Sequence, residues 1–272
     1  MFLRFYQPVE PLRSYVQYYM VAHVRCDGAP ELAMKPMPPA PQQCLYFYPR
    51  GQMHTFHYGQ NREIAVPRSI IVGPQATRVD LRFAPDHLMV CVAFWPGGLH
   101  RLLQAPVQEL FDFSLDSSLL LGRAIEEINE QLAELTDYST MLAVVENFLL
   151  RLARGIRRPA RPLDAVLPLL LTHYTNYTVE QLAHEACLSP RQFERNFMER
   201  VGMTPKLYSR IVRFDRAFRL KERQPALDWL TVALQCGYFD YPHLVRDFKA
   251  FSTVTPPLLL AAEQAHTRTA GM

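Results

Sequence analysis

The chain has 272 residues, of which 49% are hydrophobic, and a formal net charge of +3. This composition supports a sizeable core and excludes a wholly disordered protein. No apolar run reaches the roughly 18 residues of a membrane span, and the N-terminus lacks the basic and apolar regions of a signal peptide. We therefore expect a cytoplasmic protein that does not enter a membrane.

The first hundred residues contain short runs of β-branched and aromatic residues, separated by glycine and proline. We expect strands at Tyr15–Val24, Cys44–Tyr48, Ser69–Val72, Thr77–Phe83 and Leu88–Trp95. Many short strands with frequent turn signals indicate a β-barrel or a sandwich. The aromatic residues in this part either belong to its core or line an effector cavity, and the candidates for such a cavity are Tyr46, Tyr48, Phe56 and Tyr58.

Helical periodicity replaces the strand pattern after residue 96. The spacing predicts helices over residues 98–103, 122–135 and 140–154, and the last two carry apolar stripes. This pair of helices either covers the barrel or forms a dimer seam. Residues 155–162 combine one glycine, two prolines and three arginines and predict a linker. We therefore expect an N-terminal domain over residues 1–154 and a second domain over residues 163–262, followed by a frayed end.

Charge is distributed unevenly between these two parts. Residues 1–160 hold 15 basic and 15 acidic side chains, whereas residues 191–223 hold ten basic and four acidic ones. Clustered basic charge is typical of a surface that contacts phosphates. The alternative is an ordinary solvated helix face.

The second part contains the same helix-turn-helix pattern twice, at residues 178–197 and 230–249. In the first copy, Thr178 caps a helix, the turn falls at residues 187–188, and Ser189 caps the next helix. In the second copy, Gly237 supplies the turn and Asp240 is the cap. Residues 204–224 predict a long basic helix between the copies. Two such units in tandem indicate a protein that binds two stretches of duplex DNA.

Residues 163–260 are similar to the DNA-binding domain of the AraC family of bacterial transcription regulators. The matching motifs are L-A-x-x-A-x-L-S, F-x-R-x-F, G-x-T-P, V-A-x-x-x-G-Y, D-x-x-H-x-x-R-x-F-K and the final pair Thr255-Pro256. The resemblance implies seven helices, in which a long helix joins two helix-turn-helix units. It also implies that each unit enters one of two successive major-groove segments.

The resemblance assigns roles to individual residues. In the first unit, Arg191, Glu194 and Arg195 lie where the family reads bases, and Arg pairs well with guanine. Pro242, His243 and Arg246 occupy the corresponding places in the second unit. The helix pattern itself places Tyr241, His243 and Arg246 on the outward face of that unit, and these three are our candidates for reading bases there. For the DNA backbone we expect Thr178, Ser189, Lys206, Arg210, Asp240 and Lys249. RNA polymerase, a small-molecule effector and a second copy of the chain are the further partners that we expect.

The chain departs from the family pattern at three positions in and after the second unit. Pro242 replaces a Ser or Thr, Ser252 replaces a Gly, and Leu259 replaces an aromatic residue. Because Pro242 lacks a hydroxyl group, we expect the second unit to bind mainly the DNA backbone. More of the sequence specificity would then lie in the first unit.

The N-terminal half is similar to cupin-like sensor domains through R-F-Y-Q-P, S-Y-V-Q-Y-Y and F-W-P-G-G-L-H-R-L-L. The expected architecture is thus α+β, with a cupin-like barrel and flanking helices before an all-α double helix-turn-helix domain. We expect no metal, because His54 and His57 have the wrong spacing for a cupin metal site. We also expect no cofactor and no enzymatic activity. The five cysteines include no CxxC pair and predict free thiols. Two alternatives are a metal-binding or enzymatic cupin with a DNA-binding tail and a ligand-free dimerising regulator.

Overall fold

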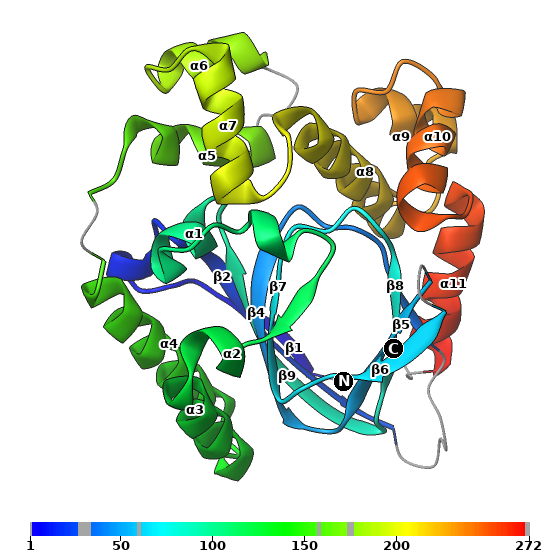
Figure 1. Cartoon of the computed structure of the whole chain (residues 1–272). Coiled ribbons are helices and arrows are strands. Elements are labelled where there is room, and N and C mark those ends of the chain that lie inside the picture. The colour runs from blue at the N-terminus through cyan, green and yellow to red at the C-terminus, as the bar shows by residue number, and fades with distance from the viewer. Residues whose placement is uncertain (1, 27–33, 59–60, 157–158, 173–176, 270–272) are drawn as a thin grey trace.

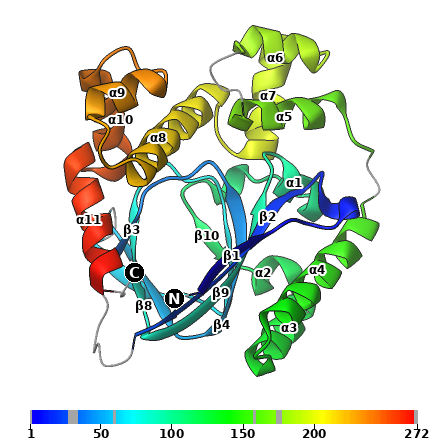
Figure 2. The same ribbon diagram turned by 180° about the vertical axis from the view of Figure 1, so that it is seen from behind.

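The computed structural model describes residues 2–26, 34–58, 61–156, 159–172 and 177–269. The N-terminal part folds into two curved antiparallel sheets that face each other like the walls of a barrel, and helices of the C-terminal part lie across one end of it (Figures 1 and 2). Within the described residues no helix is long and apolar enough to cross a membrane.

The described strands form one sheet of six strands and one of four. In spatial order the larger sheet contains β1 (Phe2–Tyr6), β2 (Val16–Arg25), β9 (Asp86–Phe94), β4 (Gln43–Arg50), β7 (Ser69–Val72) and β10 (Ser114–Asp116). The smaller sheet contains β3 (Lys35–Met37), β8 (Val79–Phe83), β5 (Met53–His57) and β6 (Arg62–Ala65). All of these strand pairs are antiparallel.

Alternating side chains give the larger sheet two different faces. Phe47 and Val90 point outward into the main N-terminal core, which also contains residues of helices on that side. Cys44 and Cys91 point the other way, toward the inside of the barrel, in a smaller cluster. The helical segments of this half are η1 (Glu10–Leu12), α1 (Gly98–Leu103), η2 (Gln108–Leu110), α2 (Ser118–Leu121), α3 (Arg123–Glu134) and α4 (Tyr138–Arg154).

Seven helices build the described C-terminal part, as the resemblance implies. They are α5 (Pro162–Thr172), α6 (Val179–Glu185), α7 (Pro190–Val201), α8 (Pro205–Arg223), α9 (Trp229–Gln235), α10 (Tyr241–Ser252) and α11 (Pro256–Thr269). Helix α8 joins the α6–α7 unit to the α9–α10 unit, and its apolar face packs into one continuous core with both. Figure 1 shows the two units at opposite ends of α8.

Two of the contacts between the domains in the described part of the chain lie far apart. At the first, the C-terminal end of α7 meets the N-terminal domain, where Gln43 Nε2 donates to the Val201 carbonyl at 2.8 Å and the Val107 amide donates to the Glu199 carbonyl at 3.2 Å. At the second, α11 lies along the smaller sheet, and Lys35 of β3 forms an ion pair with Glu263. The first helix-turn-helix unit thus contacts the N-terminal domain directly, and the helix that follows the second unit does so as well.

Most of the predicted elements form where the periodicity places them. The strand at Ser69–Val72 and the helix at Gly98–Leu103 have the predicted bounds, whereas β1, β3, β5, β6 and β10 were missed. The expected fraying after residue 262 is wrong, because α11 continues to Thr269 and buries Glu263 and His266 against the smaller sheet and its surroundings. Of the predicted linker, residues 157–158 lie outside the described residues.

Candidate nucleic-acid interface

Helix α7 presents an uncovered polar face at its N-terminal end. The Ser189 side chain accepts from the Gln192 amide, and Gln192 reaches back to Ser189, so a full capping box starts the helix. Phe193 and Phe197 are buried in the C-terminal core. The predicted base readers of this unit, on the opposite face, are all exposed: Arg191, Glu194 and Arg195.

The far end of α7 is fixed. Gly202 ends the helix with φ +87°, and its amide donates to the Met198 carbonyl at 2.8 Å. The last turn holds Arg200, which is 8% exposed and forms an ion pair with Asp164 of α5. Arg101 of α1 lies 3.9 Å from the same carboxylate, so the N-terminal domain takes part in this cluster. The base-reading end of α7 is free, while its other end is held by both domains.

Helix α10 has a different environment. Asp240 caps it by accepting from the His243 amide at 2.7 Å. Arg246 is exposed, as the prediction requires, whereas His243 is half-buried and its Nε2 lies 3.5 Å from Arg213 Nη2. Tyr241 packs partly against the C-terminal core. Of the three predicted readers in this unit, Arg246 is thus the one that projects fully into solvent.

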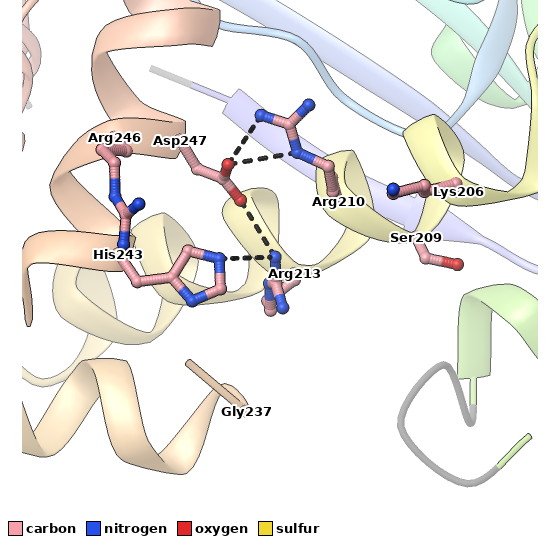
Figure 3. Close-up of a pocket in the computed structure, with 8 residues that line it drawn as sticks. All are labelled: Lys206, Ser209, Arg210, Arg213, Gly237, His243, Arg246 and Asp247. Carbon is pink, nitrogen blue, oxygen red and sulfur yellow. Dashed lines mark hydrogen bonds and ion pairs between the residues drawn. The ribbon is translucent and has the colours of Figure 1, made fainter. Parts of the chain in front are cut away.

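A groove of about 820 Å³ runs along the surface where α8 and α10 meet (Figure 3). Its walls carry Lys206, Ser209, Arg210 and Arg213 from α8 and Gly237, His243, Arg246 and Asp247 from the second unit. Four of these side chains are cationic and one is anionic, so the groove is positively charged. Cations gathered on one surface in this way attract polyanions.

Asp247 organises the cations of this groove. Its carboxylate is 3% exposed and accepts from Arg210 at 2.8 Å and from Arg213 at 3.2 Å. The Arg213 guanidinium also lies over the Tyr238 ring, 4.3 Å from its centroid. Burial raises the pKa of the Tyr238 phenol well above its usual range, and the ring therefore stays neutral. Two arginines are held in place while part of each guanidinium still faces the groove.

The predicted backbone contacts divide into two groups. Lys206 and Arg210 line the groove, and Lys249 is exposed on α10. The other three are helix caps: Thr178, Ser189 and Asp240 accept from the backbone of the helices that they start. The side-chain oxygens of all three caps therefore already have a backbone amide as a partner within the protein.

Sequence reasoning missed Asp247, although the acidic residue sits at an inward position between Leu244 and Phe248. That position was the available signal, because a carboxylate on the buried side of a basic helix needs a cationic partner. The partners, Arg210 and Arg213, are more than thirty residues away in sequence. Only the crossing of α8 and α10 brings them together.

The four predicted effector residues form two pairs. Tyr46 and Tyr48 stack on β4 with centroids 6.2 Å apart, and burial raises the pKa of both phenols. Phe56 of β5 and Tyr58 meet edge to face at 5.1 Å in the other sheet, where the Tyr58 hydroxyl donates to Asp80 at 2.7 Å. In the described part of the chain, no group of three or more His, Cys, Asp or Glu side chains is arranged to hold a metal ion.

Comparison with known proteins agrees with this geometry. Residues 182–260 match a family described as a helix-turn-helix domain, and residues 4–116 match a domain of unknown function (DUF6597). An uncharacterized HTH-type transcriptional regulator from Haemophilus influenzae is 26% identical over 227 residues, which cover 78% of this chain and 76% of that protein.

Two further relatives are more distant or more partial. The HTH-type transcriptional regulator ArgR of Pseudomonas aeruginosa is 32% identical over 79 residues, covering 29% of this chain and 24% of that protein. The solved structure of ToxT from Vibrio cholerae aligns with a TM-score of 0.47 at 12% identity and covers 90% of this chain and 98% of that one. The family match over residues 182–260 and the Haemophilus relative show that the chain carries an AraC-type helix-turn-helix domain and is a DNA-binding transcriptional regulator. Residues 4–116 match a domain family whose function is unknown.

Proposed function

We propose that this regulator binds one face of duplex DNA with α7 and α10 in successive major-groove segments and with α8 over the backbone between them. The single observation that carries the proposal is the groove that contains Lys206, Arg210 and Arg213 of α8 and Arg246 of α10, because it places four cations along the connecting helix and beside the second recognition helix. Neutralising several phosphates along such a surface gives strong, salt-dependent attraction to DNA.

In this proposal the two helix-turn-helix units contact different parts of the DNA. Arg191, Glu194 and Arg195 of α7 read base edges, because they stand free at the end that enters a groove. Arg246 and Lys249 of α10 bind mainly phosphates, together with the groove. The domain division is residues 1–154, a linker over 155–162, and residues 163 onward.

A small-molecule effector would bind inside the N-terminal barrel. The interior offers the Tyr46 and Tyr48 phenols beside Cys44 and Cys91, and so provides hydroxyl and thiol groups in an apolar setting. Helix α8 lies near Tyr18, which packs against these two cysteines. The pKa of Tyr18 is raised first by burial, then by the two thiols and then by Asp215 of α8. A ligand at this end of the barrel would therefore act directly on the helix that carries the groove.

The remaining parts of the proposal concern the wider system. The regulator works in the cytoplasm without enzymatic activity, contacts RNA polymerase, and forms a homodimer through the N-terminal half. The apolar stripes of α3 and α4 are buried in the N-terminal core. The outer faces of both helices lie on the outside of the larger sheet, where a second copy has access (Figure 1).

Selection of bound fragments from genomic DNA by the purified full chain tests the proposal. We expect one recurring site of about two helical turns, bound at least a hundredfold more tightly than random duplex at 0.15 M salt. Repeating the selection with small-molecule extracts of the cell would reveal an effector as a shift in affinity. Equal affinity for selected and random duplex would overturn sequence-specific recognition.

A further inference from the structure

The turn between α9 and α10 carries an aromatic side chain that the proposed function does not use. Phe239 is 87% exposed, more than any other large apolar side chain in the described part of the chain. It lies between two ordered neighbours: Tyr238 is buried, and Asp240 caps α10. The exposed ring is therefore held on a fixed backbone.

Comparison of the two turns shows that Phe239 is an additional residue. Cys187 and Gly237 occupy equivalent left-handed positions, with φ +54° and +75°. The next residues, Leu188 and Tyr238, donate to carbonyls at equivalent places in the preceding helices at 2.9 Å each. In the first unit the cap of the next helix follows at once. In the second unit Phe239 comes first, and its side chain is exposed whereas that of Tyr238 is buried.

The position of Phe239 determines which partner its side chain can contact. Phe239 directly precedes the cap of α10, and a helix-turn-helix presents that end of its second helix to the major groove. Two residues close to it in sequence, Gly237 and His243, line the cationic groove between α8 and α10. The polyanion that those cations attract is DNA, and DNA is therefore the partner that reaches Phe239.

We propose that Phe239 is a specificity-determining residue that contacts a thymine C5-methyl group in the major-groove segment entered by α10. That methyl group is the apolar feature of the major-groove edge, and an apolar side chain is its natural partner. The inference rests on the proposed function. It also gives the second unit a means of base recognition that does not need the hydroxyl missing at Pro242.

The test uses the full chain and the duplex obtained by genomic selection. Each thymine in the half of the site assigned to α10 is replaced singly by deoxyuridine, which removes only the methyl group. We expect the wild-type protein to lose about fourfold in affinity at one of these thymines, the factor that corresponds to one buried methyl-sized group. The Phe239→Ala variant should bind the unmodified site about fourfold or more weakly and should not respond to that deoxyuridine.

Two further variants complete the design. Phe239→Leu keeps an apolar side chain and should retain part of the response to deoxyuridine. Leu119→Ala removes another exposed apolar side chain, 73% exposed on α2 of the N-terminal domain, and should change neither affinity nor response. Equal thermal unfolding temperatures would verify that all variants are folded.

The outcomes separate this inference from the proposed function. If the wild-type protein does not prefer the selected site, the proposed function fails. If it prefers that site but Phe239→Ala keeps its affinity and its response to deoxyuridine, the inference is wrong. Unchanged DNA binding with reduced transcription by purified RNA polymerase would also overturn it and assign Phe239 to a protein contact.

Discussion

The two helix-turn-helix units share a scaffold but differ in how their second helices are held. Helix α7 is fixed at its C-terminal end, through Arg200, Gly202 and contacts with the N-terminal domain, and its N-terminal arginines are free. Helix α10 is held to α8 near its middle, through the ion pairs of Asp247 with Arg210 and Arg213. The position equivalent to Asp247 in the first unit is Asn196. One acidic residue therefore distinguishes a helix clamped beside a cationic groove from a helix that projects its side chains.

This difference shows that two copies of the same motif can have different roles in binding DNA. The same spacing of Arg and Phe places Arg195 and Arg246 at equivalent positions, and both are exposed. Arg195 has exposed neighbours suited to base edges, whereas Arg246 lines a groove suited to a phosphate backbone. The following predictions test this contrast, beginning with the largest effect.

Replacing Asp247 by Asn should lower the free energy of unfolding by about 3 kcal/mol, because two partly buried guanidinium groups lose their counter-charge. The matched control is Asn196→Ala at the equivalent position, which we expect to cost less than about 1 kcal/mol. Urea unfolding followed by circular dichroism measures both. Similar losses in the two variants would show that the second unit is not specially clamped.

Arg195→Ala should weaken binding to the selected duplex by about 1–3 kcal/mol and relax the preference at one base pair. Affinity for random duplex should change much less. Arg246→Ala is the internal comparison, and its loss should be similar on selected and random DNA. Fluorescence anisotropy with the two duplexes measures these affinities. If both variants lost affinity for the selected duplex but not for random duplex, the two units would not differ in how they contact DNA.

Lys249→Ala and Arg246→Ala should each reduce the slope of log affinity against log salt by about one, because each removes one phosphate contact. At 0.15 M salt the loss should be about 1 kcal/mol for each variant. A series of titrations at several salt concentrations measures the slope. An unchanged slope would place these two side chains away from the backbone.

The smallest effects concern the turns. Cys187 holds φ +54°, a conformation that costs an L-residue about 1 kcal/mol, so Cys187→Gly should stabilise the protein by about 0.5 kcal/mol after the entropy cost of glycine. Gly237→Ala should destabilise it by about 1 kcal/mol. Thermal unfolding measures both, and a change of the same sign in the two variants would show that the turns are not equivalent.

Local signals predicted much of this molecule. Thr178 with Gln181 and Ser189 with Gln192 are capping boxes in the structure as they are in the sequence. The apolar residues Phe193, Phe197, Phe214 and Phe218 are buried as their spacing requires. Short edge strands such as β3 and β6 were missed, because three or four residues give too little periodicity and their pairing is decided by distant strands.

By itself, the sequence determined the helices, their caps, the doubled motif and hence the contact with DNA, because each of these depends on residues only three to eight positions apart. The tertiary structure alone decided how the units differ. Asp247 meets Arg210 and Arg213 across more than thirty residues, and Gln43 meets Val201 across 158. Such contacts follow from how the helices cross and how the domains pack, and no local pattern encodes that geometry.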